Sequence, residues 1–556
     1  MTGAVLAPSH PGMARSEGTR AQGQAQTLAV VAVYLVLSGA LLAPAWLSHG
    51  QRWAGGEGNP EQVMWFLAWF PFALGHGHSG LLTNYLMAPG GANLMWSTST
   101  PLLSALLAPA TLSLGPVTSY TLAQTLAIAG SATAAFFALR SHVRRQWPAA
   151  VGGALYGFSP FVVDQALGGH LQLAIAWFPP VVLLCLTQMA RGRRPVRAGI
   201  WLGVACVAQL LLGEELLATT AILGVVVVAT LVVLFPRRSL ARARGFLAGL
   251  LAAAAVAAVL AAGPLWLQFG GPLRVRGDLA APGIWVTDLS NLVVPTSFQQ
   301  LAPHWAAAIS NGFHGNPVER ASYLGLPLLV VLVMIAVRLW RVPVVRAATV
   351  VGLVALVLSM GPELYVGGRP TGISLPWRAL RYLPMLARVL PVRLVVFAFR
   401  SAALVLAVGL DRLRAGRPTR IGAAASCLAV ASLAPLFPHV PPATTPVPTP
   451  AFFLDGQARQ VPAGSTALVL PYPFRPALWQ VQSGFRFRMP DGTVFSPGPR
   501  IYSQGGALSA VLGPIQHGKA PPPEPAAGLG HARRAPGRGR GDGRRRSHGS
   551  HRGRGS

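Results

Sequence analysis

Long apolar runs recur along most of the chain, and short polar or arginine-bearing junctions separate them. A helix needs about 20 apolar residues to cross the hydrocarbon of a bilayer, because each residue adds about 1.5 Å. Eleven runs approach this length, and the pattern therefore predicts eleven membrane-spanning helices. The predicted spans cover residues 27–46, 117–139, 149–166, 171–190, 198–213, 216–235, 246–266, 323–337, 347–366, 392–410 and 421–438.

Arginines at alternate junctions predict the direction in which the helices are inserted. Five clusters occur, at residues 140–145, 191–197, 237–244, 338–346 and 412–420. Cytoplasmic loops carry an excess of arginine and lysine, so we expect these junctions and the N-terminus to be cytoplasmic. Counting the apolar stretch 100–114 as a span would place the first cluster outside. We therefore expect a juxtamembrane helix there.

The composition excludes a soluble globular enzyme. Hydrophobic residues make up 52% of the chain and charged residues only 11%, against roughly 25% charged in soluble domains. The net charge of +30 comes mostly from the junction arginines and a basic C-terminal tail, so we expect no nucleic-acid partner. The sequence has no Walker-type loop, no HExxH and no paired CxxC. Any chemistry is therefore expected to use a donor that is already in the membrane.

These features predict a mainly α fold, a polytopic transmembrane bundle with a small extracytoplasmic α/β or β-rich C-terminal segment. The expected parts are an N-terminal cytoplasmic segment 1–26, a transmembrane domain 27–438 with long outer loops 47–116 and 267–322, a proline-rich linker 439–450, the small domain 451–515 and a disordered arginine- and glycine-rich tail 516–556. The small domain is short for a secure core, which leaves open whether it is complete.

Acidic residues favour the outer face, where this topology places nine of the ten that lie between the first and last spans. The adjacent pair Glu214 and Glu215 lies at the outer end of a predicted span, where ionisable groups are costly and point to function. Two like charges suit either proton transfer or a divalent metal, and both readings stay open. Asp164 and His170, at the neighbouring hairpin, are expected to join this site as substrate-binding residues.

One outer segment is basic, against the trend of the other junctions. Residues 376–393 carry Arg378, Arg381, Arg388 and Arg393. Arginine binds phosphate in bidentate fashion, so the segment predicts a phosphate site. The alternative is that these side chains reach anionic lipid headgroups.

Four short motifs follow one another in the first third of the chain: GNPEQ at 58–62, WFLAW at 65–69, PGGANL at 89–94 and YGFSP at 156–160. In this order they resemble an actinobacterial branch of the GT-C superfamily of polytopic glycosyltransferases, over about residues 27–506. The resemblance implies a cell-membrane enzyme that transfers a sugar from a polyprenyl-phosphate donor, among membrane lipids, to a glycan, lipid or protein acceptor on the extracytoplasmic face. It implies no certain cofactor, and a divalent metal stays open.

The chain departs from this family at the residue that the resemblance identifies as the catalytic base. Family members have an aspartate where this chain has Asn59, and an amide cannot take a proton from an acceptor hydroxyl as a carboxylate can. Either Glu61 or Glu57 replaces it, with Glu61 favoured because it lies against the aromatic motif, or this copy is catalytically impaired. The alternative functions are a lipid or glycolipid transporter and an impaired scaffold for envelope assembly.

Overall fold

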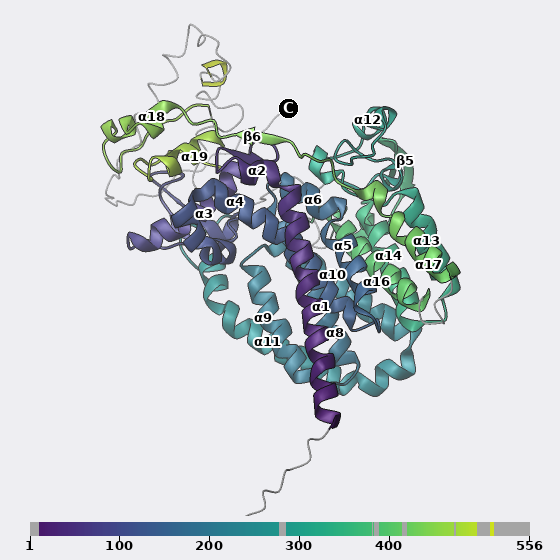
Figure 1. Cartoon of the computed structure of the whole chain (residues 1–556). Helices are drawn as coiled ribbons and strands as arrows, with labels where there is room; N and C mark the ends of the chain where they lie inside the picture. Colours follow the sequence, from purple (N-terminus) through teal and green to yellow (C-terminus); the bar gives the residue numbers. More distant parts are fainter. Residues whose placement is uncertain are drawn as a thin grey trace, which may run out of the picture. The chain divides into compact units, whose positions relative to one another are not determined.

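The computed structural model describes residues 11–276, 285–380, 382, 389–413, 420–471, 474–497 and 512–515, with side chains from residue 22 onward. Most of the regular structure in these residues is helical (Figure 1). The α-helices are α1 (Pro11–Leu41), α2 (Ala43–Leu47), α3 (Asn59–Gly75), α4 (Pro101–Arg140), α5 (Gln146–Gly157), α6 (Pro160–Leu167), α7 (Leu171–Ala174), α8 (Phe178–Ala190), α9 (Pro195–Leu210), α10 (Glu214–Leu234), α11 (Pro236–Phe269), α12 (His304–Ser310), α13 (Leu326–Arg338), α14 (Pro343–Ser359), α15 (Trp377–Leu380), α16 (Val395–Leu413), α17 (Arg420–Ala431), α18 (Ala451–Leu454) and α19 (Arg475–Gln482).

Short elements complete the described structure. Three antiparallel strand pairs join β1 (Arg52–Ala54) with β6 (Thr444–Pro446), β2 (Leu82–Thr83) with β3 (Ala92–Asn93), and β4 (Glu363–Val366) with β5 (Arg369–Ser374). The 3-10 turns are η1 (Leu94–Trp96), η2 (Leu289–Leu292), η3 (Pro317–Glu319), η4 (Pro391–Leu394), η5 (Ala434–Leu436) and η6 (Gln457–Gln460).

The protein is a multi-pass membrane protein. Six described helical segments are long and apolar enough to cross a bilayer: Gln22–Leu41, Pro101–Arg140, Leu171–Ala190, Glu214–Leu234, Pro236–Phe269 and Pro391–Leu413. Shorter apolar helices occur at Pro195–Leu210, Leu326–Arg338, Pro343–Ser359 and Arg420–Leu436. Each of the eleven apolar runs falls on one of these segments or on the pair α5 and α6. How many of them cross, and in which direction, stays a prediction.

Two breaks interrupt the apolar runs. The run 149–166, expected as one span, is divided between α5 and α6, because Ser159 caps α6 by accepting a hydrogen bond from Val162 N at 3.4 Å and Pro160 starts the new helix. In α4, Gly115 has φ 80° and ψ 166°, values that interrupt the helix and that glycine adopts without steric cost. The kink separates residues 101–114, the stretch expected to be juxtamembrane, from the rest of α4.

The five arginine-bearing junctions gather at one end of the bundle. Side chains or backbone of one junction bond to the next: Arg191 to Ser141 O, Arg242 to Ala190 O, Arg346 to Leu234 O, and Arg145 N to the Asp411 carboxylate. Arg140 also donates to Thr27 Oγ1 at 3.0 Å, which places the beginning of the first apolar helix at the same end. Alternate junctions therefore meet, as the positive-inside pattern predicts for a single membrane face.

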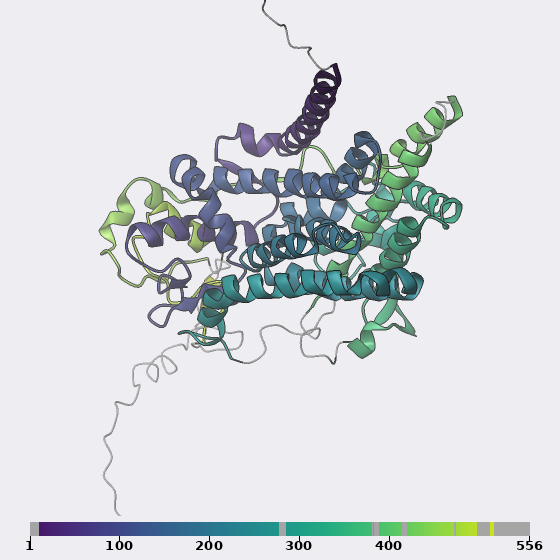
Figure 2. The ribbon, with the colours of Figure 1, turned by 90° about the horizontal axis from the view of Figure 1, so that it is seen from below.

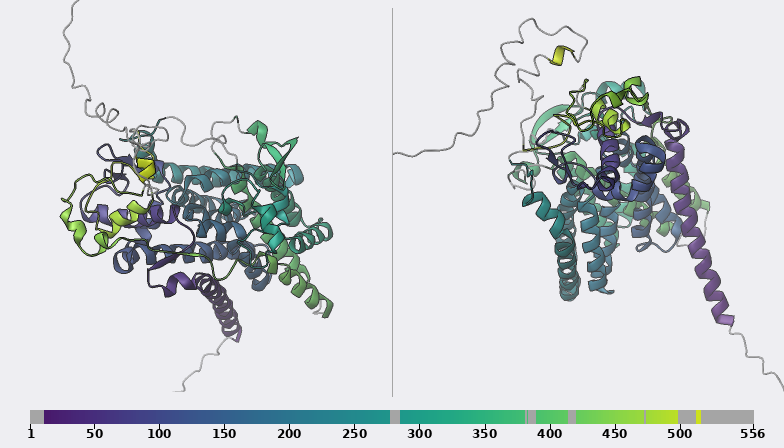
Figure 3. Two further views of the ribbon diagram at one scale, coloured as in Figure 1. Left: turned by 90° about the horizontal axis from the view of Figure 1, so that it is seen from above. Right: turned by 90° about the vertical axis from the view of Figure 1, so that its left-hand side faces the viewer.

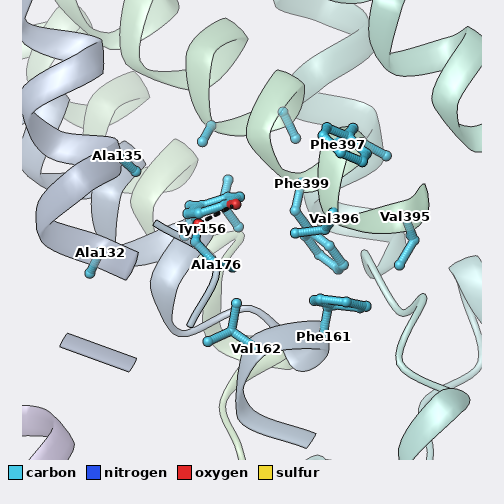
Figure 4. Close-up of a cluster of buried hydrophobic side chains, with 14 of the residues drawn as sticks. Ala132, Ala135, Tyr156, Phe161, Val162, Ala176, Val395, Val396, Phe397 and Phe399 are labelled. Carbon is cyan, nitrogen blue, oxygen red and sulfur yellow. Dashed lines mark hydrogen bonds between the residues drawn. The ribbon is translucent and has the colours of Figure 1, made fainter. Parts of the chain in front are cut away.

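Burial differs sharply between the helices. In the segment Pro391–Leu413, which contains α16, every residue of the most apolar stretch is buried. In the most apolar stretches of α1 and α11, only 17% of the residues are buried. Phe397 and Phe399 of α16 pack near Phe161 and Tyr156, and the Tyr156 hydroxyl donates to Ala176 O at 2.8 Å (Figure 4). In contrast, α1 lies at the edge of the bundle (Figure 2), and α11 packs against the shorter helix α9 (Figure 3). Apolar faces of α1 and α11 are thus left for lipid.

The segment after the linker packs on the aromatic helix α3. Trp65 and Trp69 stack at 5.2 Å between ring centroids, and both pack against Phe485. Trp65 Nε1 donates to Gln480 Oε1 of α19 at 2.7 Å, and α19 lies beside α3 (Figure 1). The sequence predicts an α/β or β-rich segment here, and residues 451–471 and 474–497 contain α18, α19, the turn η6 and one isolated bridge, Thr466 to Arg488. Their apolar side chains complete the core around α3 instead of forming a sheet.

The predicted orientation can be tested with single cysteines. In a variant with the three native cysteines replaced by serine, Arg369→Cys on β5 should react with a membrane-impermeant maleimide in intact cells, and Arg193→Cys should react only after permeabilisation. Labelling of Arg193→Cys in intact cells, with Arg369→Cys protected, would show that the protein is inserted in the opposite direction.

Candidate functional site

The first turn of α3 holds the motif residues Asn59 and Glu61. Glu61 is fully buried, and its Oε2 accepts a hydrogen bond from the backbone N–H of Gly58 at 2.7 Å, as the third residue of a helix often does. Burial raises the pKa of this carboxyl to about 7. Its other oxygen, Oε1, is buried and has no hydrogen-bond partner in the described part of the chain. Glu61 therefore stabilises the helix start, and a catalytic role for it stays a prediction that requires this turn to open.

A tight turn between α6 and α7 brings His170 against Asn59. Gly169 has φ +76°, and a Cβ there would lie 2.7 Å from the Pro60 ring, so only glycine fits at this contact. The turn places the Asn59 amide nitrogen 2.7 Å from His170 Nε2. The position at which the resemblance expects an aspartate thus contacts an imidazole.

His170 continues into a chain of buried side chains. Its Nδ1 lies 2.5 Å from Gln165 Oε1, and Gln165 Nε2 donates to Glu319 Oε2 at 3.1 Å. Burial lowers the pKa of His170 to about 4, so the ring is neutral at pH 7. With Asn59 donating to Nε2, the ring proton must be on Nδ1, where it donates to the Gln165 carbonyl.

Arg393 joins this chain to α10. Its Nε and one terminal nitrogen donate to Glu319 Oε1 at 3.1 and 2.6 Å, and its other terminal nitrogen pairs with Glu215. We call the six residues Asn59, Gln165, His170, Glu215, Glu319 and Arg393 the polar cluster. Two carboxylates already neutralise Arg393, so its predicted phosphate binding would require one of them to be displaced.

Glu214 turns away from the polar cluster. Successive residues of a helix point about 100° apart. Glu215 therefore faces Arg393, whereas Glu214 points elsewhere. Its Oε1 accepts a hydrogen bond from Gln268 Nε2 of α11 at 2.6 Å. Glu214 is exposed, and its Oε2 has no partner among the residues that the structure describes. The carboxylate lies in the first turn of α10, where the helix dipole favours a negative charge.

The other predicted site residues lie apart from this cluster or outside the described residues. Asp164 is buried on α6, and neither carboxylate oxygen has a hydrogen-bond partner within the described part of the chain. Glu57 forms an exposed ion pair with Arg475 at 2.6 Å. Arg378 is exposed on α15 and donates to Ser374 Oγ at 2.6 Å. Arg381 and Arg388 lie outside the described residues.

The structure brings together His170, Glu215 and Arg393 of the predicted site with the motif residue Asn59, and it adds Gln165 and Glu319. Glu319 is one polar residue of the long loop 267–322, and Gln165 lies within a predicted span. A buried glutamine in an apolar run is a recognisable signal for Gln165, whereas nothing local distinguishes Glu319 from its loop neighbours. Among the described residues, no group of three histidine, cysteine or acidic side chains is placed to hold a metal ion.

Sequence comparison now assigns the family. A family model described as Domain of unknown function (DUF6311) matches residues 27–434. The chain belongs to the DUF6311 family. The matched region begins with the first apolar run and ends in the last, so it contains every residue of the polar cluster. A comparison of this DUF6311 protein with curated proteins finds no match.

One similar solved structure is the oligosaccharyltransferase of Archaeoglobus fulgidus in its apo form. The TM-score is 0.40 at 11% sequence identity, with 84% of the DUF6311 chain and 64% of the archaeal chain covered. The DUF6311 chain thus spans somewhat less than two thirds of the length of that protein.

The buried and exposed ion pairs of this DUF6311 protein should differ in their effect on stability. Arg393→Gln leaves Glu215 and Glu319 without their cation, and we expect it to cost about 3 kcal/mol of unfolding free energy. Arg475→Gln breaks the exposed pair with Glu57 and should cost at most about 1 kcal/mol. Tryptophan fluorescence during unfolding in mixed detergent micelles measures both. Equal small losses would mean that the Arg393 pairs add nothing to folding.

Proposed function

We propose that the protein is a membrane-embedded glycosyltransferase of GT-C type. It transfers a sugar from a polyprenyl-phosphate donor to an envelope acceptor at the end of the bundle that is opposite the arginine junctions. The resemblance of the motifs supports the class of reaction. The placement of Glu214 is the structural observation on which the proposal depends most.

Glu214 is the acid best placed to act as the base. Glu61 is buried in its helix cap, and Glu319 has both oxygens bonded by Arg393 and Gln165. Glu214 instead keeps Oε2 free while Gln268 holds Oε1. It also begins α10, which is long and apolar enough to cross a bilayer, and a lipid-linked donor would present its phosphate near the end of such a helix.

The chemistry requires one proton acceptor. The acceptor hydroxyl attacks the anomeric carbon, the bond between that carbon and the phosphate oxygen breaks, and the hydroxyl proton passes to Glu214. The lipid phosphate leaves with the electron pair of the broken bond. In this proposal the polar cluster has a positioning role, because Glu215 is bonded to Arg393 and thereby fixes the first turn of α10.

Conservative variants of the exposed acids test this assignment. With purified protein in nanodiscs, a polyprenyl-phosphate sugar and an acceptor, Glu214→Gln should lower turnover by about 10²–10⁴-fold, the usual contribution of a general base. Glu57→Gln should change turnover little, because in this proposal Glu214 and not Glu57 is the base. Glu363→Gln, on the β4 strand, is the matched control. Unchanged turnover in Glu214→Gln would refute the role of Glu214.

A second candidate function is a catalytically impaired scaffold, which the Asn59 contact favours. The Asn59 amide donates to His170, whereas an aspartate would favour a protonated imidazole and raise the pKa of His170. If the protein is impaired because of Asn59, Asn59→Asp should raise turnover at least tenfold over a near-zero background. If Glu214 is the base, wild-type protein turns over and Asn59→Asp brings no gain. Lipid-linked sugar consumption, followed by mass spectrometry, distinguishes the two.

A further inference from the structure

A cavity of about 520 Å³ lies just beyond the end of α11, apart from the polar cluster. It is lined by Gly271, Leu273, Arg274, Arg276, Ser496 and Pro497. The lining thus combines the first residues of the second long outer loop with residues that follow α19. None of these residues belongs to the polar cluster.

Both arginines of this cavity are free to bind a ligand. Exposed and half-buried residues alternate from 272 to 276, so Arg274 and Arg276 share the exposed side of the chain. Within the described structure, neither guanidinium has a hydrogen bond or an ion pair. This differs from Arg393 and Arg475, which pair with carboxylates.

The backbone under these arginines is held in place by the PGGANL motif. Asn93 is fully buried, and its amide donates to Leu267 O at 2.9 Å and to Pro272 O at 3.1 Å. Trp96 Nε1 donates to Gln268 O at 2.9 Å. On the other side of the cavity, Ser496 Oγ donates to Gly91 O at 2.8 Å. The PGGANL motif therefore holds the backbone on both sides of the cavity. A ligand that binds there needs to order little of the protein.

Because the cavity lies just beyond the end of α11, a candidate membrane span, we expect it to lie at the boundary of the bilayer. Trp266 and Phe269, in the last turn of this apolar helix, are 67% and 57% exposed. Exposed aromatic side chains at the end of a membrane helix mark the headgroup region. Arg274 follows Phe269 by five residues, so we expect its guanidinium to lie at the depth of the lipid phosphates.

We propose that this cavity binds the phosphate of a lipid phosphomonoester. Two guanidinium groups bring two positive charges, and arginine forks bind phosphate oxygens in pairs. A phosphomonoester carries about −1.5 to −2 at pH 7, which matches the two charges. A phosphodiester headgroup carries a single negative charge and leaves one arginine uncompensated.

The site also neighbours the proposed base. Gln268, whose carbonyl is held by Trp96, bonds Glu214 through its side chain. The cavity begins three residues later, at Gly271. Binding at the cavity does not depend on the proposed transfer reaction, so a binding measurement without an acceptor distinguishes failure of the site from failure of the function.

Native mass spectrometry of the full chain in neutral detergent tests the site. The probes are dioleoyl phosphatidic acid, a monoester, and dioleoyl phosphatidylglycerol, a diester with the same acyl chains. We expect the wild type to bind the monoester at least fivefold more tightly. Arg274→Gln/Arg276→Gln should weaken monoester binding at least tenfold, since each lost charged hydrogen bond is costly. The charge-matched control Arg369→Gln/Arg459→Gln should bind as the wild type does.

Three results would overturn the proposal. Equal monoester binding by the wild type and Arg274→Gln/Arg276→Gln would remove the arginines from the site. Equal affinity of the wild type for the two lipids would exclude monoester recognition, and this comparison needs no variant to fold. Displacement of the lipid by an equal concentration of inorganic phosphate would show that the ligand is free phosphate and that the lipid contributes nothing.

Discussion

The arrangement of the bundle at the end opposite the arginine junctions depends on the pairing of Arg393 with two carboxylates that come from distant parts of the chain. Glu215 lies in the first turn of α10, Glu319 lies in η3, and Arg393 lies in η4, just before α16. A buried guanidinium is stable only when anions compensate the cost of removing it from water. Satisfying that one cation therefore holds three elements together. Gln165, His170 and Asn59 extend the contact to α6, to the turn before α7 and to α3.

The helices and their common end could be predicted from the sequence, because both follow from local composition. Apolar runs of membrane length give the helices, and arginine clusters identify the junctions that meet at one end, as the bonds from Arg191 to Ser141 and from Arg145 to Asp411 show. The shared face of Trp65 and Trp69 also follows from helical spacing. The polar cluster could be predicted only in part. Glu319 pairs with residues far away in sequence, and no periodicity identifies that partner.

The motifs that suggested an enzyme family have mainly structural roles in the described residues. In GNPEQ, Glu61 closes the helix start and Gln62 bonds Thr493 O at 2.7 Å. In YGFSP, Ser159 caps α6. Asn93 of PGGANL holds the loop beneath two arginines. In this chain the motifs therefore build helix ends and turns, whereas Glu214, which lies outside them, is exposed.

The chain of bonds from Asn59 to Glu319 has a fixed direction. Asn59 donates to His170, His170 donates to Gln165, and Gln165 donates to Glu319. The two amides on either side of the imidazole have no proton that they exchange at neutral pH. The imidazole therefore cannot pass a proton along this route between the start of α3 and the buried Glu319. The chain of bonds therefore fixes the orientation of these side chains and carries no proton between α3 and Glu319.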